Sequence, residues 1–167
     1  MSNRVTQHAD RYLDDFAAGD SFQTGSHTLT EAEIADFARR FDPQPWHLDR
    51  DAAARGPFKA ITASGWHTTA LTMRLLVDSG VMRATGILGT GIDELRWRAP
   101  VFPNDTLHVE ATVVSVERSA ERPDRGRLRV RVETKNQRGE VVLSMIAILS
   151  MKRRAGQSHR DQRPNTV

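Results

Sequence analysis

The sequence predicts an α+β protein of two layers, in which one apolar helix packs on an antiparallel β-sheet. Two observations lead to this prediction. Residues 66–79 form a helix-length segment with apolar side chains over most of its surface. From residue 86 to residue 151, apolar and polar residues instead alternate with a period of two, and turn residues separate the runs at hairpin spacing. A chain of 167 residues is long enough for one such domain with a core of its own.

The first elements are expected between residues 21 and 42. Residues 21–29 alternate as a short strand does. Thr30 and Glu33 form a capping-box pattern that begins a helix. Asp42 precedes Pro43, and a residue before proline avoids the α region, so the helix must end one residue earlier. Asp42 then lies at a helix C-terminus, where the helix dipole disfavours an anion, and we expect its pKa to be raised.

The remaining elements follow from the same patterns. A short helical turn is expected over residues 48–54, and the long helix over residues 66–79 ends at Gly80. Because the apolar residues of the long helix surround it, we expect it to be buried. Four strands follow, at residues 86–98, 106–117, 127–133 and 141–151, with an irregularity near Gly89–Gly91.

The two ends of the chain differ in composition from its middle. We divide it into an N-terminal extension (1–20), a folded domain (21–152) and a disordered basic tail (153–167). Residues 152–167 carry a net charge of +4, so the rest of the chain is at −1 although the whole is at +3. Such a tail can bind nucleic acid, but a nucleic-acid protein is expected to show a basic face on its folded domain. A nucleic-acid partner is therefore not favoured.

Composition excludes several further classes of site. The chain has no cysteine, which excludes disulfides, a thiolate nucleophile and cysteine-bound metals. Its histidines show no metal-ligand spacing, so no metal is expected. No other cofactor is expected either. No apolar run is long enough to span a bilayer, and the first twenty residues lack the apolar core of a signal peptide. We expect a cytoplasmic protein that does not contact the membrane.

The segment from Asp42 to His47 is the main candidate for chemistry. Two prolines, Pro43 and Pro45, stiffen the path between an acid and an imidazole. We therefore expect a rigid, extended loop that carries both side chains, and such a pair can remove one proton and deliver another. The alternative is a turn with a helix-capping Asp and a surface His, and the spacing alone does not decide between them.

Three segments together resemble the MaoC-like dehydratases, which are relatives of the (R)-specific enoyl-CoA hydratases. They are Phe41-Asp-Pro-Gln-Pro-Trp-His47, Ala63-Ser-Gly65 and Arg98-Ala-Pro-Val-Phe-Pro-Asn-Asp105. The family's signature is Asp-x-Asn-Pro-x-His, followed by an Ala-His-Gly turn that opens the central helix and by a Pro-Gly-Asp turn. The resemblance covers about residues 10–152. It implies the hot-dog fold, in which a curved antiparallel sheet wraps a central helix, an acyl-CoA thioester substrate, and a homodimer or higher homo-oligomer.

The resemblance also implies catalytic roles. Asp42 and His47 would flank a water beside the C2–C3 double bond of an enoyl thioester, with His47 as the base toward water and Asp42 as the acid toward carbon. The backbone N–H of Gly65, at the start of the central helix, would hold the negative charge that develops on the thioester oxygen. Alternatively, Gly65 serves only to allow a tight start to that helix.

Gln44, Ser64 and Trp66 are expected to line the substrate site, and two of them depart from the family pattern. Gln44 stands where the family often has Asn, and Ser64 replaces its His. Ala70 stands where some hydratases carry a Ser that orders the water. These departures bear on whether the chain is an active hydratase.

Three further residues near the expected site can serve either the site or the packing of the protein. Trp46 and Trp66 suggest a restricted pocket for a short or branched acyl group, but each can instead be a core or interface residue. His67 is a further candidate for the site, with a packed or surface role as its alternative.

Three functions therefore remain in competition. The first is hydration or dehydration of an enoyl-CoA or 3-hydroxyacyl-CoA thioester. The second is a hot-dog thioesterase, but those enzymes usually take an acid from the central helix, and here Asp78 at its far end is the only one. The third is a non-catalytic acyl-CoA binder, which the departures at Gln44 and Ala70 keep open.

Overall fold

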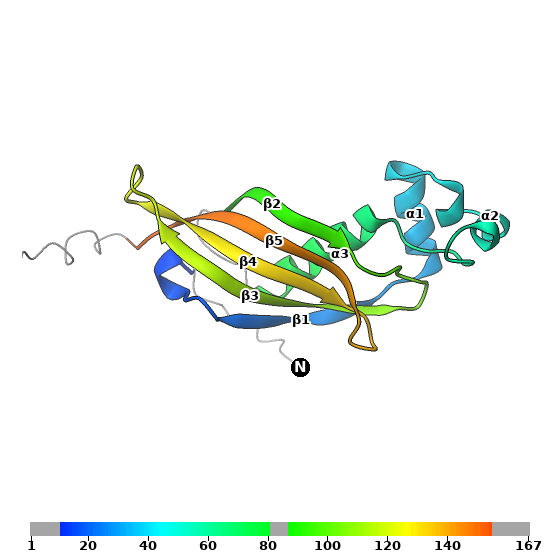
Figure 1. The fold of residues 1–167 in the computed structure, drawn as a ribbon, viewed down its shortest axis with the longest axis horizontal. Coiled ribbons are helices and arrows are strands. Elements are labelled where there is room, and N and C mark those ends of the chain that lie inside the picture. Colours follow the sequence, from blue (N-terminus) through cyan, green and yellow to red (C-terminus); the bar gives the residue numbers. More distant parts are fainter. Residues whose placement is uncertain (1–10, 81–86, 155–167) are drawn as a thin grey trace, which may run out of the picture.

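The computed structural model describes residues 11–80 and 87–154. They form one antiparallel sheet, a long helix against it, and two shorter helices gathered at one end of the sheet (Figure 1). In chain order the elements are η1 (Leu13–Asp15), β1 (Ser21–Thr28), α1 (Glu31–Phe41), η2 (Pro45–His47), α2 (Arg50–Arg55), α3 (Gly65–Asp78), β2 (Leu88–Trp97), β3 (Thr106–Arg118), β4 (Arg125–Lys135) and β5 (Val141–Lys152), where η marks a 3-10 turn.

The five strands lie in the order β1-β3-β4-β5-β2, and every neighbouring pair is antiparallel. β1 and β2 are therefore the two edges of the sheet. The pairing of β2 with β5 shifts register between Gly89 and Gly91, as the glycine pattern predicts. The α+β prediction, with one long helix on an antiparallel sheet, is confirmed.

The alternation along β4 separates the two faces of the sheet. Leu128, Val130 and Val132 are buried, whereas Arg127 and Arg131 between and beside them are exposed. The largest fully buried apolar side chains of the core are Leu13, Leu29, Ile34, Leu107, Val109, Leu128, Val132, Val142, Leu143 and Met151. They come from most of the chain, so the sheet and the helices share one core.

The expectation that the long helix is buried on all sides is wrong for the single chain. α3 buries Thr68, Thr72, Leu75 and Leu76, and a hydrogen bond of 2.6 Å joins the Thr72 and Thr134 hydroxyls within the core. Three other apolar residues of α3 lie on its outer side: Trp66 is 56% exposed, Met73 50% and Val77 57%. The sheet covers only one face of the helix, so an apolar stripe faces outward.

Both ends of α1 lie where the sequence predicted them. Thr30 and Glu33 form the predicted capping box, and Asp42 is the C-cap residue of α1. The segment after it does not continue the helix, but the expectation that it is extended throughout is wrong. Pro45–His47 form a 3-10 turn. Proline is tolerated at its first position because an N–H there would have no hydrogen-bond partner within the turn.

Part of the expected N-terminal extension packs against the sheet. Leu13 is 1% exposed and Phe16 8%. Arg153 and Arg154, which follow β5, pair with Asp14 and Asp15 respectively. The domain boundaries placed after residues 20 and 152 remain predictions, and residues 155–167 lie outside the described part of the chain.

Among the described helices, α3 with 14 residues is the longest, and none is long and apolar enough to cross a membrane.

Candidate active site

Asp42 and His47 come together at the end of α1. The Oδ2 atom of Asp42 lies 3.5 Å from Nε2 of His47. The side chain of His47 is 7% exposed and that of Asp42 18%. The 3-10 turn over Pro45–His47 brings the imidazole back toward the C-cap carboxylate, so the turn replaces the extended path that the prolines suggested.

The other ring nitrogen of His47 fixes its tautomer. Nδ1 lies 2.6 Å from the carbonyl oxygen of Thr62. Because a carbonyl oxygen can only accept a hydrogen bond, Nδ1 carries the proton and donates it to Thr62. In the neutral imidazole, Nε2 then has a free lone pair, which is directed toward Asp42.

The carboxylate of Asp42 is held by two donors. The Ser64 hydroxyl donates to Oδ2 at 2.6 Å, and the Gln44 amide donates to Oδ1 at 2.7 Å. The hydrogen bond from Ser64 is the largest cause that lowers the pKa of Asp42; burial raises it, and Gln44 and His47 lower it further. The expectation of a raised pKa from the helix dipole is wrong, because hydrogen bonds to the ionised carboxylate outweigh the dipole.

Ser64 therefore does two things at once. It is 1% exposed, and its hydroxyl, besides donating to Asp42, accepts a hydrogen bond of 3.2 Å from the backbone N–H of Trp66 as the N-cap of α3. Gly65 is the first residue of α3, so its N–H has no carbonyl four residues earlier within the helix to bond to. The start of the helix and the acid are thus joined through one side chain.

A cavity of about 240 Å³ opens beside this cluster. His47 and Gly65 line it, whereas Asp42 and Ser64 are not among its lining residues; Asp42 lies next to it through its contact with His47. The rest of the lining is mostly apolar and consists of Phe58, Thr62, Ala63, Thr68, Trp97, Arg98, Ala99, Pro100, Val101 and Val142. An imidazole and a helix N-terminus therefore face one apolar space.

Trp97 is a residue of this site that the sequence did not indicate. A Cβ atom at Gly65 would lie 2.6 Å from the Trp97 indole, so the ring occupies the space that glycine leaves. The indole N–H donates to the Thr69 hydroxyl at 3.2 Å, and the ring packs edge-on against Trp66 at 5.2 Å between centroids. The sequence predicted that Trp97 lies on a strand just before Arg98-Ala-Pro. It did not predict the register of β2 with β5, which brings the Trp97 ring over α3.

The other sequence candidates lie near the site without lining the cavity. Trp46 is 40% exposed, so a core role is wrong for it and for the still more exposed Trp66, and an interface role remains. His67 stacks on Phe37 with ring centroids 4.6 Å apart, and burial lowers its pKa. These contacts favour the packed alternative for His67. Ala70 is exposed on the outer face of α3.

Within residues 11–80 and 87–154, no three His, Asp or Glu side chains gather closely enough to hold a metal ion.

The chain matches the family model described as "MaoC like domain" over residues 15–136. A MaoC-like dehydratase from Rhodospirillum rubrum of known crystal structure is 49% identical to it, with a TM-score of 0.82 over 86% of this chain and 98% of that one. The structure of an R-hydratase from Pseudomonas aeruginosa is 26% identical, with a TM-score of 0.65 over 86% of each chain. The hot-dog arrangement expected from the resemblance is thereby confirmed.

Two curated proteins extend the comparison. The uncharacterized protein YdeM of Bacillus subtilis is 35% identical over 127 residues, which is 75% of this chain and 88% of that protein. The 3-hydroxyacyl-thioester dehydratase Z of Mycobacterium tuberculosis is 31% identical over 104 residues, which is 60% of this chain and 69% of that protein.

Replacing Ser64 by alanine should raise the pKa of Asp42, because it removes the largest cause that lowers it. A lowered pKa in the folded state stabilises the protein above the pKa of the unfolded chain, and this contribution is lost as the pH falls through the folded-state value. Ser64→Ala should therefore lose less stability on acidification than the wild type does. Carboxyl carbon shifts of Asp42 followed by NMR measure the pKa, and Ser26→Ala, an exposed serine of β1, is the control. An unchanged pKa of Asp42 in Ser64→Ala would contradict this reading of the site.

Proposed function

This chain belongs to the MaoC-like domain family, and on that premise we propose that it catalyses the reversible hydration of an enoyl thioester to a 3-hydroxyacyl thioester. Two relatives support this reaction by their names, the R-hydratase of Pseudomonas aeruginosa and the 3-hydroxyacyl-thioester dehydratase Z of Mycobacterium tuberculosis. The observation that carries the proposal is the buried pair of acceptors, Asp42 Oδ2 and His47 Nε2, 3.5 Å apart beside the apolar cavity.

Such a pair suits one water molecule. Asp42 is ionised at neutral pH because its pKa is lowered, and in the neutral tautomer that the Thr62 carbonyl selects, Nε2 of His47 has a free lone pair. Both atoms are therefore acceptors, and a water can donate one O–H to each of them. Its oxygen lone pairs then point away from the pair toward the cavity, where C3 of a bound enoyl group would lie.

The proposed reaction follows from these roles. The water oxygen forms a bond to C3 while His47 Nε2 takes one of its protons, and the electrons of the C2–C3 double bond move toward the thioester carbonyl. The resulting imidazolium then returns that proton to C2, so that the water is divided between C2 and C3 and His47 is neutral again. Asp42 orients the water and stabilises the imidazolium. This replaces the expected role of Asp42 as the acid, because an ionised carboxylate has no proton to give.

The negative charge that develops on the thioester oxygen needs a donor, and we assign this role to the N–H of Gly65. It is the first N–H of α3, it belongs to a residue that lines the cavity, and the positive end of the helix dipole reinforces it. One such donor is worth about 3 kcal/mol of barrier in other enzymes. Ser64 and Gln44 then position Asp42, and neither needs to contact the substrate itself.

The size and lining of the cavity bear on the acyl group. A volume of about 240 Å³ with mostly apolar walls suits a short or branched acyl chain. We propose an acyl-CoA of this kind as the substrate.

The two competing functions are less well supported. A thioesterase acid on the central helix would have to be Asp78, which is 54% exposed at the far end of α3 and paired with Arg74. A non-catalytic acyl-CoA binder has no use for a buried, hydrogen-bonded carboxylate beside a histidine of fixed tautomer. Release of free thiol from acyl-CoAs would favour the thioesterase, and tight binding without turnover would favour the binder.

Replacing Asp42 by asparagine or His47 by glutamine should lower the rate of crotonyl-CoA hydration about 10²–10⁴-fold, the range typical of removing a general acid or base. Loss of the conjugated thioester absorbance measures the rate, and a branched enoyl-CoA should be included because of the cavity size. Asp36→Asn is the matched control, since Asp36 lies on the exposed side of α1 and pairs with Arg39 on the same helix. Unchanged turnover in both site variants, with their fold intact, would refute the proposed mechanism.

We also propose that the protein forms at least a homodimer through the face that α3 and β2 leave open. The outward stripe of α3 includes Trp66, Met73 and Val77. β2 is an edge strand with unpaired backbone groups, and it adds three exposed apolar side chains, Leu88, Ile92 and Trp97. An apolar helix face next to an open strand edge is what an isologous pair of subunits can bury.

Replacing Met73 by glutamate should convert the oligomer to a monomer, because it would bury a charge at the centre of the stripe. Light scattering coupled to size-exclusion chromatography measures the mass. Val114→Glu, an exposed apolar position on β3, is the control and should leave the mass unchanged. A wild-type monomer, or a Met73→Glu variant with the wild-type mass, would rule out this interface.

A further inference from the structure

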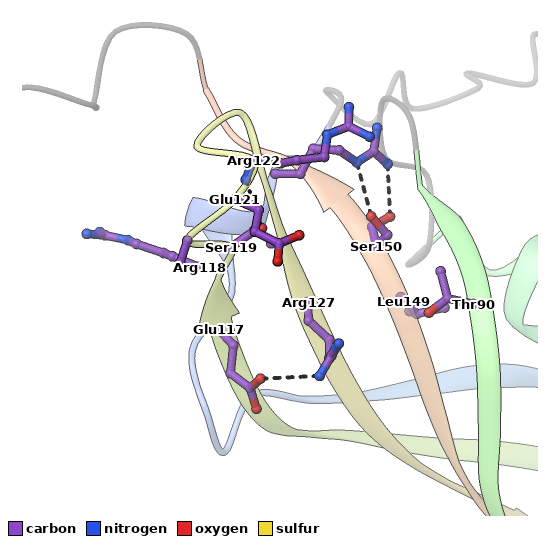
Figure 2. Close-up of a pocket in the computed structure, with 12 residues that line it drawn as sticks. Thr90, Glu117, Arg118, Ser119, Glu121, Arg122, Arg127, Leu149 and Ser150 are labelled. Carbon is purple, nitrogen blue, oxygen red and sulfur yellow. Dashed lines mark hydrogen bonds and ion pairs between the residues drawn. The ribbon is translucent and has the colours of Figure 1, made fainter.

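A second cavity, of about 520 Å³, lies at the end of the sheet away from α1, α2 and the catalytic cavity (Figure 1). Figure 2 shows the residues that line it. It is formed by the hairpin between β3 and β4 and by the nearby ends of β5 and β2. Four arginines line it, Arg118, Arg122, Arg125 and Arg127. Two carboxylates, Glu117 and Glu121, line it as well, so the cavity wall has an excess of positive charge.

Arg125 is held in a defined position within this wall. Its Nε atom donates to the Ser150 hydroxyl at 3.0 Å and its Nη2 atom to the Ser150 carbonyl oxygen at 3.5 Å, as Figure 2 shows. Arg127 meets Glu117 only at 3.8 Å, and Arg122 meets Asp124 at 3.6 Å. These pairs are long and well exposed, so they are weak and can rearrange around a stronger anion.

The lining indicates the kind of ligand. Several guanidinium groups with neighbouring hydroxyls from Thr90, Ser119 and Ser150 match the oxygens of phosphate groups, which arginine binds with two parallel hydrogen bonds. One carboxylate would need only one of the arginines. An anion with several phosphate charges can use more than one of them, although the Arg118 side chain points away from the other arginines (Figure 2).

The position of this cavity relates it to the catalytic site. β5 runs between the two: Val142 lines the catalytic cavity, and Leu149 and Ser150 line the arginine cavity. From position 142 to position 150 a strand advances roughly 26 Å, at about 3.3 Å per residue. In CoA the phosphates are separated from the thioester by the long pantetheine arm, so a site for them must lie well away from the reacting carbons.

We propose that the arginine cavity binds the phosphate groups of the CoA nucleotide, a proposal that rests on the proposed function for the identity of the ligand. The cavity thereby selects thioesters of a phosphorylated carrier, while the small apolar cavity selects the acyl group. Arg125 and Arg127 contribute most, since they stand on β4 and its sheet partners fix their backbones.

Titration of the whole protein with adenosine 3′,5′-bisphosphate tests the cavity without any turnover. The double variant Arg125→Gln/Arg127→Gln should bind this nucleotide at least about tenfold more weakly than the wild type, because two charge-assisted contacts are lost. Arg39→Gln/Arg74→Gln removes the same charge from exposed helix positions and should bind as the wild type does. The loss of Arg125 could disturb the fold, because Arg125 is hydrogen-bonded to Ser150. The single variant Arg127→Gln changes an exposed side chain only and should also bind the nucleotide more weakly than the wild type. Equal affinity in both double variants, or no binding by the wild type, would overturn the proposal.

Turnover of two thioesters then separates this proposal from the proposed function. Arg125→Gln/Arg127→Gln should raise KM for crotonyl-CoA about tenfold with kcat unchanged, and should leave kcat/KM for the crotonyl ester of N-acetylcysteamine, which has no phosphate, at the wild-type value. An equal loss with both substrates would refute a phosphate role. If the wild type turns over neither substrate, the proposed function fails, and the nucleotide titration still decides whether the cavity binds phosphate.

Discussion

Two hydrogen bonds between separate chain segments define this site. One runs from the Ser64 hydroxyl to Asp42 and the other from His47 Nδ1 to the Thr62 carbonyl, and both are 2.6 Å long. They join the segment after α1 to the segment that begins α3. The same few residues also place Gly65, the first residue of α3, at the cavity. The acid, the imidazole and the helix N-terminus therefore cannot move independently of one another.

This arrangement decides the charge state of Asp42. A helix dipole acts on an exposed terminal charge with about 0.3–1 kcal/mol. A hydrogen bond to an ionised group contributes about 1.5–3 kcal/mol, and Asp42 accepts two. The hydrogen bonds therefore outweigh the dipole, and the carboxylate stays ionised. When His47 carries its proton on Nδ1 alone, Asp42 Oδ2 and His47 Nε2 are both acceptors, and one water can donate to both of them.

Sequence patterns predicted the local structure well. The capping box at Thr30 and the proline after Asp42 set the bounds of α1, and the alternation around Leu128 identified the buried face of β4. These features depend on neighbours in the chain. Membership of the family also followed from three short segments, because their residue types and order are specific.

The features that could not be predicted depend on contacts between distant residues. Ser64 is 22 positions from Asp42, and nothing local indicates that its hydroxyl holds the carboxylate. Trp97 reaches Gly65 only through the register of β2 with β5. The apolar residues of α3 predicted burial, but which face the sheet covers depends on tertiary packing, and the buried face includes Thr68 and Thr72. The Thr72 hydroxyl is accommodated there by its hydrogen bond to Thr134, beside the buried Leu75 and Leu76.

Nitrogen-15 NMR of the His47 side chain in the free protein at neutral pH tests the central claim most directly. The shifts should show a proton on Nδ1, because Nδ1 donates to the Thr62 carbonyl oxygen. A ring without a proton on Nδ1 would contradict the account, because Thr62 would then not hold the imidazole and Nε2 could not act as the base.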